Sequence, residues 1–510
     1  MSKPILIVGA GPTGLMLALW LARLGAPLRI IDKDQGPGET SRAMAVHART
    51  LEFYRQLGFA DEVVQKGLKV DRVSVREAGK LEGAATFGDL GQGLSQFPFV
   101  LSCPQDEHEK ALLAQLEAVG VSVERGTELT AFEQEEDGVS ATLRTSAGEQ
   151  TVEASFVAGC DGARGSVRQA TGIQLPGGTY SHRFFVADAV VEGEAARDSM
   201  NLCLTGQDFC IVIPVRRPGT ARLIGVVPDG IDQERVRFED VAPSVKRNTG
   251  LDIKQVNWFS TYNVHHRVAD HFRDRRAFLL GDAAHLHSPV GGQGMNTGLG
   301  DAANLAWKLA AVIDGRAMPT LLDSYEPERI AFARRLVATT DRMFQLVTDR
   351  GLIGKGWRTV VLAHALPLAF KLPVVPSLAF KTISQIEVEY RDGPLSQGKA
   401  GDVHGGDRLP WVLEGDADNF EPLHSLDWQL HVYGSAPPAL RQAADSRLLP
   451  LHVFEWGKEA RAKGLSRDAL YLVRPDGYVG YADGGADAAP LLTYLDRWGI
   501  RGRGTSGPTS

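Results

Sequence analysis

Two glycine-rich segments about 270 residues apart carry the residue types best suited to chemistry in this sequence. GAGPTG at 9–14 follows the apolar run ILIV at 5–8, and GDAAH at 281–285 follows AFLL at 277–280. Glycines where a strand feeds a helix bring backbone N–H groups close to phosphates. The carboxylate of Asp282 can accept hydrogen bonds from sugar hydroxyls. The pair of segments therefore suits a large cofactor whose two ends are held by distant parts of one fold.

The first segment has the spacing of a dinucleotide fingerprint. Gly9 permits the tight turn, Gly11 lets the backbone approach a pyrophosphate, and Gly14 allows the helix to pack closely on the strand. Asp32 lies 18 residues after Gly14 at the end of the next strand, where it can accept hydrogen bonds from an adenosine ribose. The residues predicted to bind this half of the cofactor are Gly9, Gly11, Pro12, Thr13, Gly14, Asp32 and Lys33.

The second segment continues as HSPVGGQGMN at 287–296 and then turns into a helix. Backbone N–H groups at a helix start stabilise negative charge that develops on the N1–C2=O side of a reduced flavin. Together the two motifs predict FAD. On this side we predict cofactor contacts from Gly281, Asp282, Gly294, Met295 and Asn296, with Pro289, Gly292 and Gln293 as catalytic residues along the flavin's reactive edge.

Length and charge limit the classes of protein that this chain could belong to. With 510 residues, two or three domains are expected. The net charge of −7 argues against nucleic acid or an anionic membrane surface as a partner. The apolar stretch at 361–380 contains Lys371 and three prolines, which favours packed helices and turns over a membrane span. The first residues run straight into a strand with no room for a signal peptide, so we expect a cytoplasmic protein.

The cysteines and histidines indicate neither a disulfide framework nor a metal site. The four cysteines are irregularly spaced and form no CxxC pair. His285 and His287 have no third ligand at a usable spacing. We therefore predict no metal.

The elements that must position these residues predict an α/β (α+β) fold. A Rossmann-like FAD-binding domain is interrupted by a mostly antiparallel sheet, because the periodicity is close to two across 177–271. The expected parts are residues 1–176 (first part of the FAD-binding domain, with 72–101 a candidate contribution to the substrate domain), 177–271 (substrate sheet), 272–392 (second part and helices), 393–407 (linker), 408–500 (small α/β domain) and 501–510 (disordered tail).

The chain resembles the class A flavoprotein aromatic hydroxylases, the p-hydroxybenzoate hydroxylase-like family. Within it, the chain is similar to a three-domain branch that includes phenol, chlorophenol and aromatic-polyketide hydroxylases. The resemblance implies a glutathione-reductase-like FAD domain and a C-terminal thioredoxin-like domain, here without CxxC. It rests on GAGPTG at 9–14, Asp32, SRA at 41–43, Gln105, CDGARGSVR at 160–168, GDAAHLHSPVGGQGMNTG at 281–298, DAANLAWKLA at 301–310 and YEPER at 325–329.

Further site residues follow from the resemblance alone. Arg42 is expected to contact the FAD pyrophosphate or the isoalloxazine as a binding and catalytic residue, and Gln105 to hold the ribityl or diphosphate region. Asp161 is expected to serve FAD and the nicotinamide donor together. Gly165 stands where the family often has serine, which leaves Arg164 and Arg168 as the stronger donors there.

The resemblance also implies the reaction. A single-component monooxygenase would use NADPH or NADH, FAD and dioxygen to hydroxylate a phenolic or related small aromatic compound through a flavin C4a-hydroperoxide. The alternatives are a reductase of the same fold or a flavoprotein that sequesters an aromatic ligand without turnover. The WxWxIP signature of flavin halogenases is absent. A monomer or homodimer is expected.

Several points stay open at this level. His265, His266 and Tyr262 could act in catalysis or simply pack at a domain junction. The strands at 180–270 carry no portable code for the substrate, and no second dinucleotide fingerprint separates NADPH from NADH.

Overall fold

A computed structural model describes most of the chain. Arg42, Pro289, residues 361–379 of the apolar stretch and residues 505–510 of the tail lie outside the described residues. The described residues are 3–38, 43–70, 72–86, 91–197, 200–205, 208–215, 219–288, 292–348 and 380–504.

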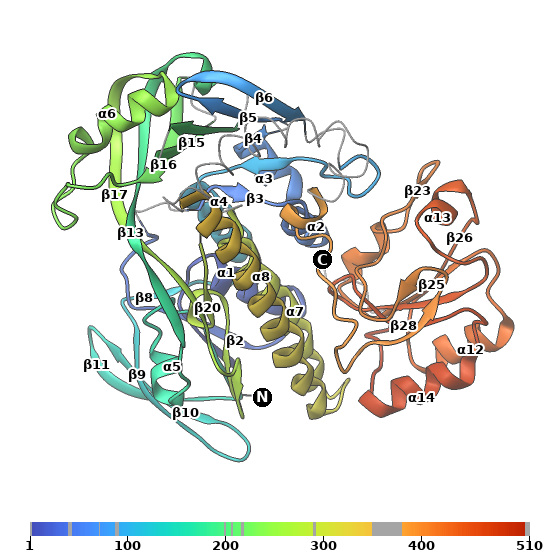
Figure 1. Cartoon of the computed structure of the whole chain (residues 1–510). Helices are drawn as coiled ribbons and strands as arrows, with labels where there is room; N and C mark the ends of the chain where they lie inside the picture. The colour runs from blue at the N-terminus through green and yellow to red at the C-terminus, as the bar shows by residue number, and fades with distance from the viewer. Residues whose placement is uncertain are drawn as a thin grey trace.

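A six-stranded sheet forms the centre of the FAD-binding part (Figure 1). All its neighbouring strands are parallel except the edge pair β18–β19. Continuous apolar runs are typical of strands that are covered on both faces, as in β1. Its order is β18 (Arg273–Asp274), β19 (Ala277–Leu279), β12 (Phe156–Gly159), β1 (Ile5–Val8), β2 (Leu28–Asp32) and β8 (Glu124–Arg125).

This strand order brings the two glycine-rich segments to the same edge of the sheet. β1 leads into helix α1 (Pro12–Arg23), while β19 leads towards helix α7 (Gly294–Ile313). The two helices pack against each other. Residues 14–21 of α1 are all buried, as its apolar sequence predicts, and Gly25 follows the helix with a φ of +73°.

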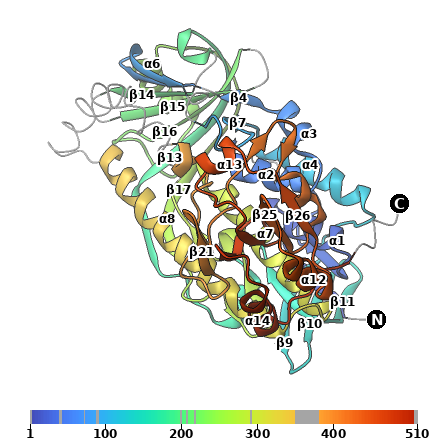
Figure 2. The same ribbon diagram turned by 90° about the vertical axis from the view of Figure 1, so that its right-hand side faces the viewer.

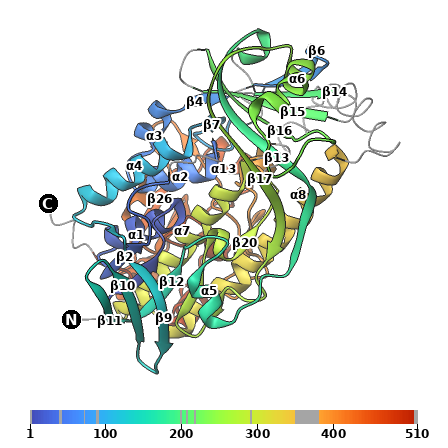
Figure 3. The same ribbon diagram turned by 90° about the vertical axis from the view of Figure 1, so that its left-hand side faces the viewer.

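An eight-stranded sheet forms the predicted substrate layer (Figure 3). It is antiparallel except between β14 and β5, and helix α6 (Phe238–Thr249) packs on one face. Strands from 72–86 complete one edge, and strand β20, which follows GDAA, completes the other. The order is β20 (His285–Leu286), β17 (Asp252–Val268), β13 (Gly177–Glu192), β16 (Thr220–Val226), β15 (Asp208–Pro214), β14 (Met200–Thr205), β5 (Arg72–Glu77) and β6 (Lys80–Thr86).

Smaller elements surround these two sheets. Two three-stranded sheets consist of β3 (Ala45–Val46), β7 (Val100–Ser102) and β4 (Leu68–Val70), and of β9 (Glu128–Gln134), β10 (Val139–Thr145) and β11 (Gly148–Ala154). The other helices of this part are α2 (Ala48–Gln56), α3 (Ala60–Lys66), α4 (Gln105–Ala118), α5 (Ser166–Thr171) and α8 (Tyr325–Thr348), with short 3₁₀ turns at Glu194–Ala196, Gly281–Ala283 and Pro319–Ser324.

The C-terminal domain has the thioredoxin topology that the resemblance implies. Its core sheet has the order β28-β27-β25-β26, with β25 parallel to β26 and antiparallel to β27. The chain follows β25 (Gln429–Tyr433), α12 (Pro438–Ser446), β26 (Leu451–Phe454), α13 (Lys458–Ala462), β27 (Leu470–Val473), β28 (Val479–Asp483) and α14 (Ala488–Trp498), after a hairpin of β23 (Leu413–Glu414) and β24 (Ala417–Asp418) and a 3₁₀ turn at Glu421–Ser425.

Two stretches differ from the sequence-based expectation. The segment 393–407, predicted to be a linker, contributes β21 (Gln397–Ala400) and β22 (Val403–His404) to the C-terminal sheet. A Cβ on Gly405 would lie 2.3 Å from the Gln397 nitrogen, so glycine serves close packing there rather than flexibility.

The start of the expected disordered tail is also held. Within residues 501–504, the Gly502 and Arg503 amides donate to the Arg447 carbonyl (2.9 Å) and the Asp427 carboxylate (2.6 Å). In the part of the chain that the structure describes, no helix is long and apolar enough to cross a membrane.

Candidate flavin-binding site

The three glycines in the turn between β1 and α1 have different surroundings: two are packed against the protein, and one faces open space. A Cβ on Gly9 would lie 2.5 Å from the Cys160 carbonyl oxygen, and one on Gly14 only 1.9 Å from the Gly9 carbonyl oxygen. A Cβ on Gly11 would meet no described atom within 4 Å. Gly11 is also the N-cap of α1 and Pro12 has no N–H, so the first amides of the helix are those of Thr13 and Gly14, and no side chain caps them. This arrangement fits a pyrophosphate.

Asp32 lies directly against this turn. Its two carboxylate oxygens accept from the amide of Ala10 (2.6 Å) and the amide of Asp34 (2.9 Å), and Arg125 lies 3.7 Å away. The side chain keeps 14% exposure, and each oxygen has a second lone pair. The carboxylate is therefore fixed in direction and remains open to a ribose hydroxyl, while Lys33 is exposed beside it.

Thr13 joins the two distant motifs. A Cβ on Gly281 would lie 2.7 Å from the Thr13 hydroxyl oxygen, and one on Gly298 would lie 2.4 Å from it. Gly281 also has a φ of +59°, which favours glycine. The first turn of α1 thus occupies space that these two glycines leave free. Asp282, exposed on the 281–288 segment, stands beside that contact.

Asp301 of α7 holds this segment in place. Its Oδ2 accepts from the Gly281 amide (3.0 Å) and bonds the His285 ring (2.7 Å), and its Oδ1 accepts from Arg329 (2.6 Å). Burial would raise the pKa of Asp301, but Arg329 and His285 hold it below its usual value. We did not assign Asp301 or Arg329 from sequence, although both lie in segments that carry the family resemblance.

The start of α7 is tied to the loop before α2 through Asn296. Its side chain accepts from the His47 amide (2.9 Å) and the Thr50 hydroxyl (2.8 Å), and it donates to the Ala45 (2.8 Å) and Gly292 (3.0 Å) carbonyls. Both polar atoms are therefore used within the protein. If Asn296 contacts the cofactor as predicted, the contact must come from its backbone.

Gly292 and Gln293 complete this helix start. Gly292 has a φ of +62°, and a Cβ there would lie 2.7 Å from that of Ala45. Gln293 is buried and accepts from Gln385 at 3.3 Å. These contacts require glycine at 292 and hold the amides that follow it.

Gly294 and Met295 begin α7 beside a neutral histidine. The His287 ring bonds the Ser288 carbonyl through Nδ1 (2.9 Å), and a Cβ on Gly294 would lie 3.6 Å from its Nε2. Burial lowers the pKa of His287 to about 4. Any positive potential at this helix start near neutral pH therefore comes from the backbone, not from His287. Met295 is half-buried against the core.

Gln105 fixes the residue that follows Arg42. Its side-chain oxygen accepts from the Ala43 backbone amide, and the Gln105 backbone amide donates to the Ala43 carbonyl, both at 3.2 Å. Its Nε2 donates to Glu109 (2.7 Å). Gln105 is thus placed beside the predicted site of Arg42, whose own position is outside the described residues.

The Asp161 side chain bonds the first turn of helix α5, whose N-cap residue is Gly165. One of its oxygens accepts from the Ser166 hydroxyl (2.9 Å) and the Val167 amide (3.1 Å). A Cβ on Gly165 would lie 2.3 Å from the other oxygen, so the departure from serine has a steric reason. Ser166 makes the hydroxyl contact from the next position.

Arg168 braces the 281–288 segment instead of projecting as a free donor. Its guanidinium donates to the Ala283 carbonyl (3.0 Å) and the Ala163 carbonyl (2.7 Å), and the residue is buried. Arg164 is exposed. Of the two cations expected near Asp161, only Arg164 stays accessible.

The histidines left open by the sequence lie on β17 where it pairs with β13. His265 Nδ1 bonds the Thr179 hydroxyl at 2.7 Å, and burial lowers its pKa. The His266 ring packs against Tyr180, and the Tyr262 ring lies 6.0 Å from that of Phe184. These contacts favour packing for the two histidines and leave Tyr262 on an aromatic face.

No group of three or more metal-ligating side chains occurs in the described ranges. The His285 ring is bound to the Asp301 carboxylate.

Comparison with known proteins places these features in context. The profile of a family described as "FAD binding domain" matches residues 2–340. The chain is 34% identical to a 6-methylpretetramide 4-monooxygenase of Streptomyces rimosus over 505 residues, covering 93% of this chain and 90% of that protein. It is 32% identical to a pentachlorophenol 4-monooxygenase of Sphingobium chlorophenolicum, covering 96% and 95%.

A solved structure extends the similarity to the whole fold. An anhydrotetracycline hydroxylase from Streptomyces rimosus superimposes with a TM-score of 0.79 at 29% identity, covering 98% of this chain and 100% of that chain. The expected FAD-binding fold and the FAD cofactor are confirmed.

The glycine turn gives a matched pair of variants. Gly11→Ala places a methyl group in open space, so the apoprotein should fold normally while FAD binds at least about tenfold more weakly, from crowding of the pyrophosphate. Gly14→Ala must displace the Gly9 carbonyl and should lower the melting temperature of the apoprotein. Differential scanning fluorimetry and FAD titration distinguish them; wild-type FAD affinity in a folded Gly11→Ala protein would contradict this placement.

Asp32→Ala tests the ribose contact. Loss of a hydrogen bond to a charged acceptor costs about 1.5–3 kcal/mol, so FAD should bind roughly 10- to 100-fold more weakly. Turnover at saturating FAD should change much less. Asp34→Ala, two residues along the chain and exposed, is the control for the apoprotein's stability, and an unchanged FAD dissociation constant in Asp32→Ala would exclude the role.

Proposed function

Because this chain belongs to the family of FAD-dependent aromatic hydroxylases, we propose that its substrate is a neutral, largely apolar polycyclic phenol. The enzyme consumes dioxygen and a reduced nicotinamide. One oxygen atom enters the aromatic ring, the other leaves as water, and the nicotinamide supplies the two electrons. The reductase and ligand-sequestering alternatives receive no support from the named relatives.

The apolar face of the eight-stranded sheet is the observation that supports this substrate class. The opposite face is taken up by α6, where Phe185, Ala187 and Leu223 pack with Val241 and Val245. The remaining face presents two rows across the strands: Tyr262, Phe184 and Val226, and then Ser260, Val186, Ile224, Ile211 and Leu202. Phe184 and Val186 are buried within this face, whereas Tyr262, Ile224, Ile211 and Leu202 are half-buried and offer apolar contact that suits flat rings.

The charge at the end of this face supports a neutral ligand. In the next row, Arg222 forms a two-point ion pair with Asp188 (both contacts 2.7 Å) and lies 5.9 Å from the Trp258 ring. Arg222 is fully buried, so its charge is balanced within the protein. A substrate carboxylate would compete with Asp188 for the same guanidinium.

Arg222 also relates this face to the flavin site. It donates to the Ala43 carbonyl (3.3 Å), and Ala43 is held by Gln105. Ser102 donates to Pro214 from the same small sheet that contains β3. The apolar rows therefore end beside the 43–47 loop, which Asn296 ties to the start of α7.

We assign the residues as follows. The α1 turn binds the pyrophosphate, Asp32 the ribose and Asp282 the ribityl chain, and the 292–296 amides face the isoalloxazine. When bound, the flavin supplies electron transfer and oxygen activation. The protein orients the ring, excludes water and holds a neutral His287 beside these amides. Arg42, Pro289 and the accessible Arg164 are proposed to contact FAD or the nicotinamide.

The names of two relatives support a polycyclic substrate further. Those proteins act, by their names, on 6-methylpretetramide and on anhydrotetracycline, whereas a third acts on pentachlorophenol, a phenol with a single ring. All four cysteines are free, which suits a reducing compartment, and we propose a cytoplasmic monomer or homodimer.

The test is a screen of aromatic compounds with the FAD-loaded enzyme. A neutral polycyclic phenol should stimulate NADPH or NADH oxidation, and mass spectrometry should find a product heavier by one oxygen atom, formed in step with the nicotinamide consumed. Carboxylated single-ring phenols serve as the matched comparison and should give at least about tenfold lower kcat/KM. Preference for the carboxylated compounds would overturn the substrate class, and stimulation without oxygenated product would overturn turnover on that ligand.

A further inference from the structure

A turn of the C-terminal domain is buried in the FAD-binding part of the chain. The turn is RPDG at 474–477, between β27 and β28, and Figure 2 shows its domain lying over α7 and α8. Arg474 is 0% exposed and Asp476 is 1% exposed. Turns normally lie on the surface, and buried charges are costly unless they are paired. A turn that buries two charged side chains therefore needs partners.

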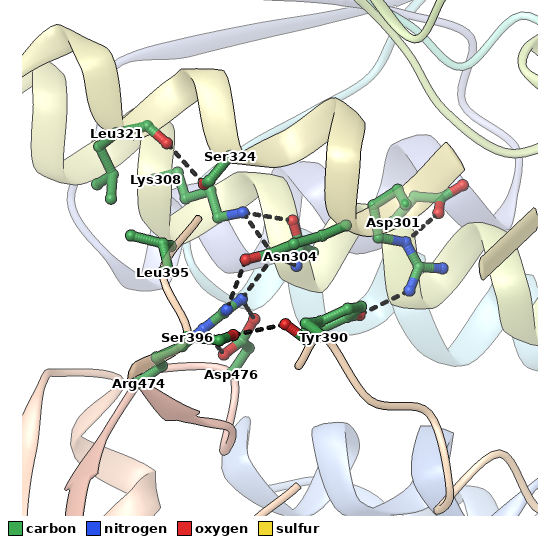
Figure 4. A network of polar contacts seen from close by, with 12 residues as sticks. Asp301, Asn304, Lys308, Leu321, Ser324, Tyr390, Leu395, Ser396, Arg474 and Asp476 are labelled. Carbon is green, nitrogen blue, oxygen red and sulfur yellow. Dashed lines mark hydrogen bonds and ion pairs between the residues drawn. The ribbon is translucent and has the colours of Figure 1, made fainter. Parts of the chain in front are cut away.

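One set of partners is on α7 and α8 (Figure 4). The Arg474 guanidinium donates to both Glu328 oxygens at 2.8 and 3.0 Å, and Lys308 lies 2.9 Å from Glu328. Asp476 accepts from Arg474 at 2.7 Å, and Asn304 donates to Glu328 at 2.7 Å. Two cations and two anions thus balance within one buried cluster.

The electrostatics of this cluster follow from its burial. Burial would raise the pKa of Glu328, but Arg474 and Lys308 hold it down at about 2. Burial lowers the pKa of Lys308 to about 8, against the pull of Glu328. Loss of any one member leaves an unbalanced buried charge, so the members are interdependent.

The same turn also contacts α2. Arg49 donates to the Asp476 carbonyl (2.5 Å), and Gln56 donates to the Pro475 carbonyl (3.0 Å). The turn therefore contacts α2 and α8 through hydrogen bonds, and α7 through the Trp307 ring, which lies 5.2 Å from the Arg474 guanidinium.

Two of these contacts lie close in sequence to residues tied to the flavin site: Arg49 on α2 and Glu328 on α8. α2 begins next to His47, whose amide donates to Asn296 at the start of α7. On α8, Arg329 is adjacent to Glu328 and binds Asp301, which holds Gly281.

Tyr390 adds to the connection between the turn and the flavin site that runs through Arg329 of α8. Its hydroxyl accepts from Arg329 at 2.7 Å, and its ring lies 4.4 Å from that of Tyr478, next to the turn. The Arg474 guanidinium lies 5.3 Å from the centre of the Tyr390 ring. The C-terminal domain therefore packs directly on the group that orients Arg329.

We propose that the RPDG turn positions the flavin site. It fixes α2 and α8 together, and through Asn296 and Asp301 it fixes the 43–47 loop and the 281–288 segment. Docking of the turn and binding of FAD are then coupled, and each strengthens the other by the same factor. Arg474 and Tyr390 are positioning residues, since neither belongs to the residues assigned to FAD.

The experiment uses the full chain. Arg474→Met should raise the FAD dissociation constant at least about tenfold and alter the visible circular dichroism of bound flavin, while Tyr390→Phe should raise the constant about threefold. Arg474→Lys should recover part of the loss. The matched control is Arg55→Met, which removes another contact between α2 and the C-terminal domain, to Asp418 at 2.7 Å, without touching the turn.

The two readouts separate positioning from bulk stability. The control should lower the melting temperature yet keep the FAD dissociation constant within about twofold of wild type. A folded Arg474→Met protein with wild-type FAD affinity and an unchanged flavin spectrum would overturn the proposal. If Arg474→Met does not fold, Tyr390→Phe decides the question, and a wild-type dissociation constant in that variant overturns it as well.

Discussion

The carboxylate of Asp301 is the interaction on which the flavin site depends. It is 1% exposed and contacts the Gly281 amide, the His285 ring and the Arg329 guanidinium. These partners belong to the 281–288 segment and to α8, while Asp301 itself lies on α7. One buried charge therefore fixes three separate elements relative to each other. Because a buried carboxylate must be paired, replacing one of its partners leaves a buried charge without compensation.

Close approach of backbone is the second constraint. Gly14 packs on Gly9 itself, and Gly281 and Gly298 leave room for Thr13, so the two motifs can meet only where Cβ atoms are missing. Gly11 differs because its missing Cβ opens onto space rather than onto protein. The same residue type thus serves packing at most positions and ligand access at one.

Much of the fold and the identity of the FAD cofactor followed from the sequence. The fingerprint at 9–14 with Asp32 and the 281–285 segment predicted FAD because each motif can be recognised from its own local residues. The sequence could not predict which partner each polar group bonds. The Asn296 side chain bonds the 43–47 loop, and the Arg168 guanidinium donates to backbone carbonyls. The strands within 393–407 were missed because glycine signals both flexibility and tight packing.

The central claim is that Asp301 assembles the site, and FAD affinity of Asp301→Asn measures it most directly. The amide cannot balance Arg329 and accepts less strongly from Gly281. We expect FAD to bind at least about tenfold more weakly, as for loss of one charged hydrogen bond. The apoprotein should retain its near-ultraviolet circular dichroism, which shows that its aromatic core is folded. Wild-type FAD affinity in a folded Asp301→Asn protein would contradict the account.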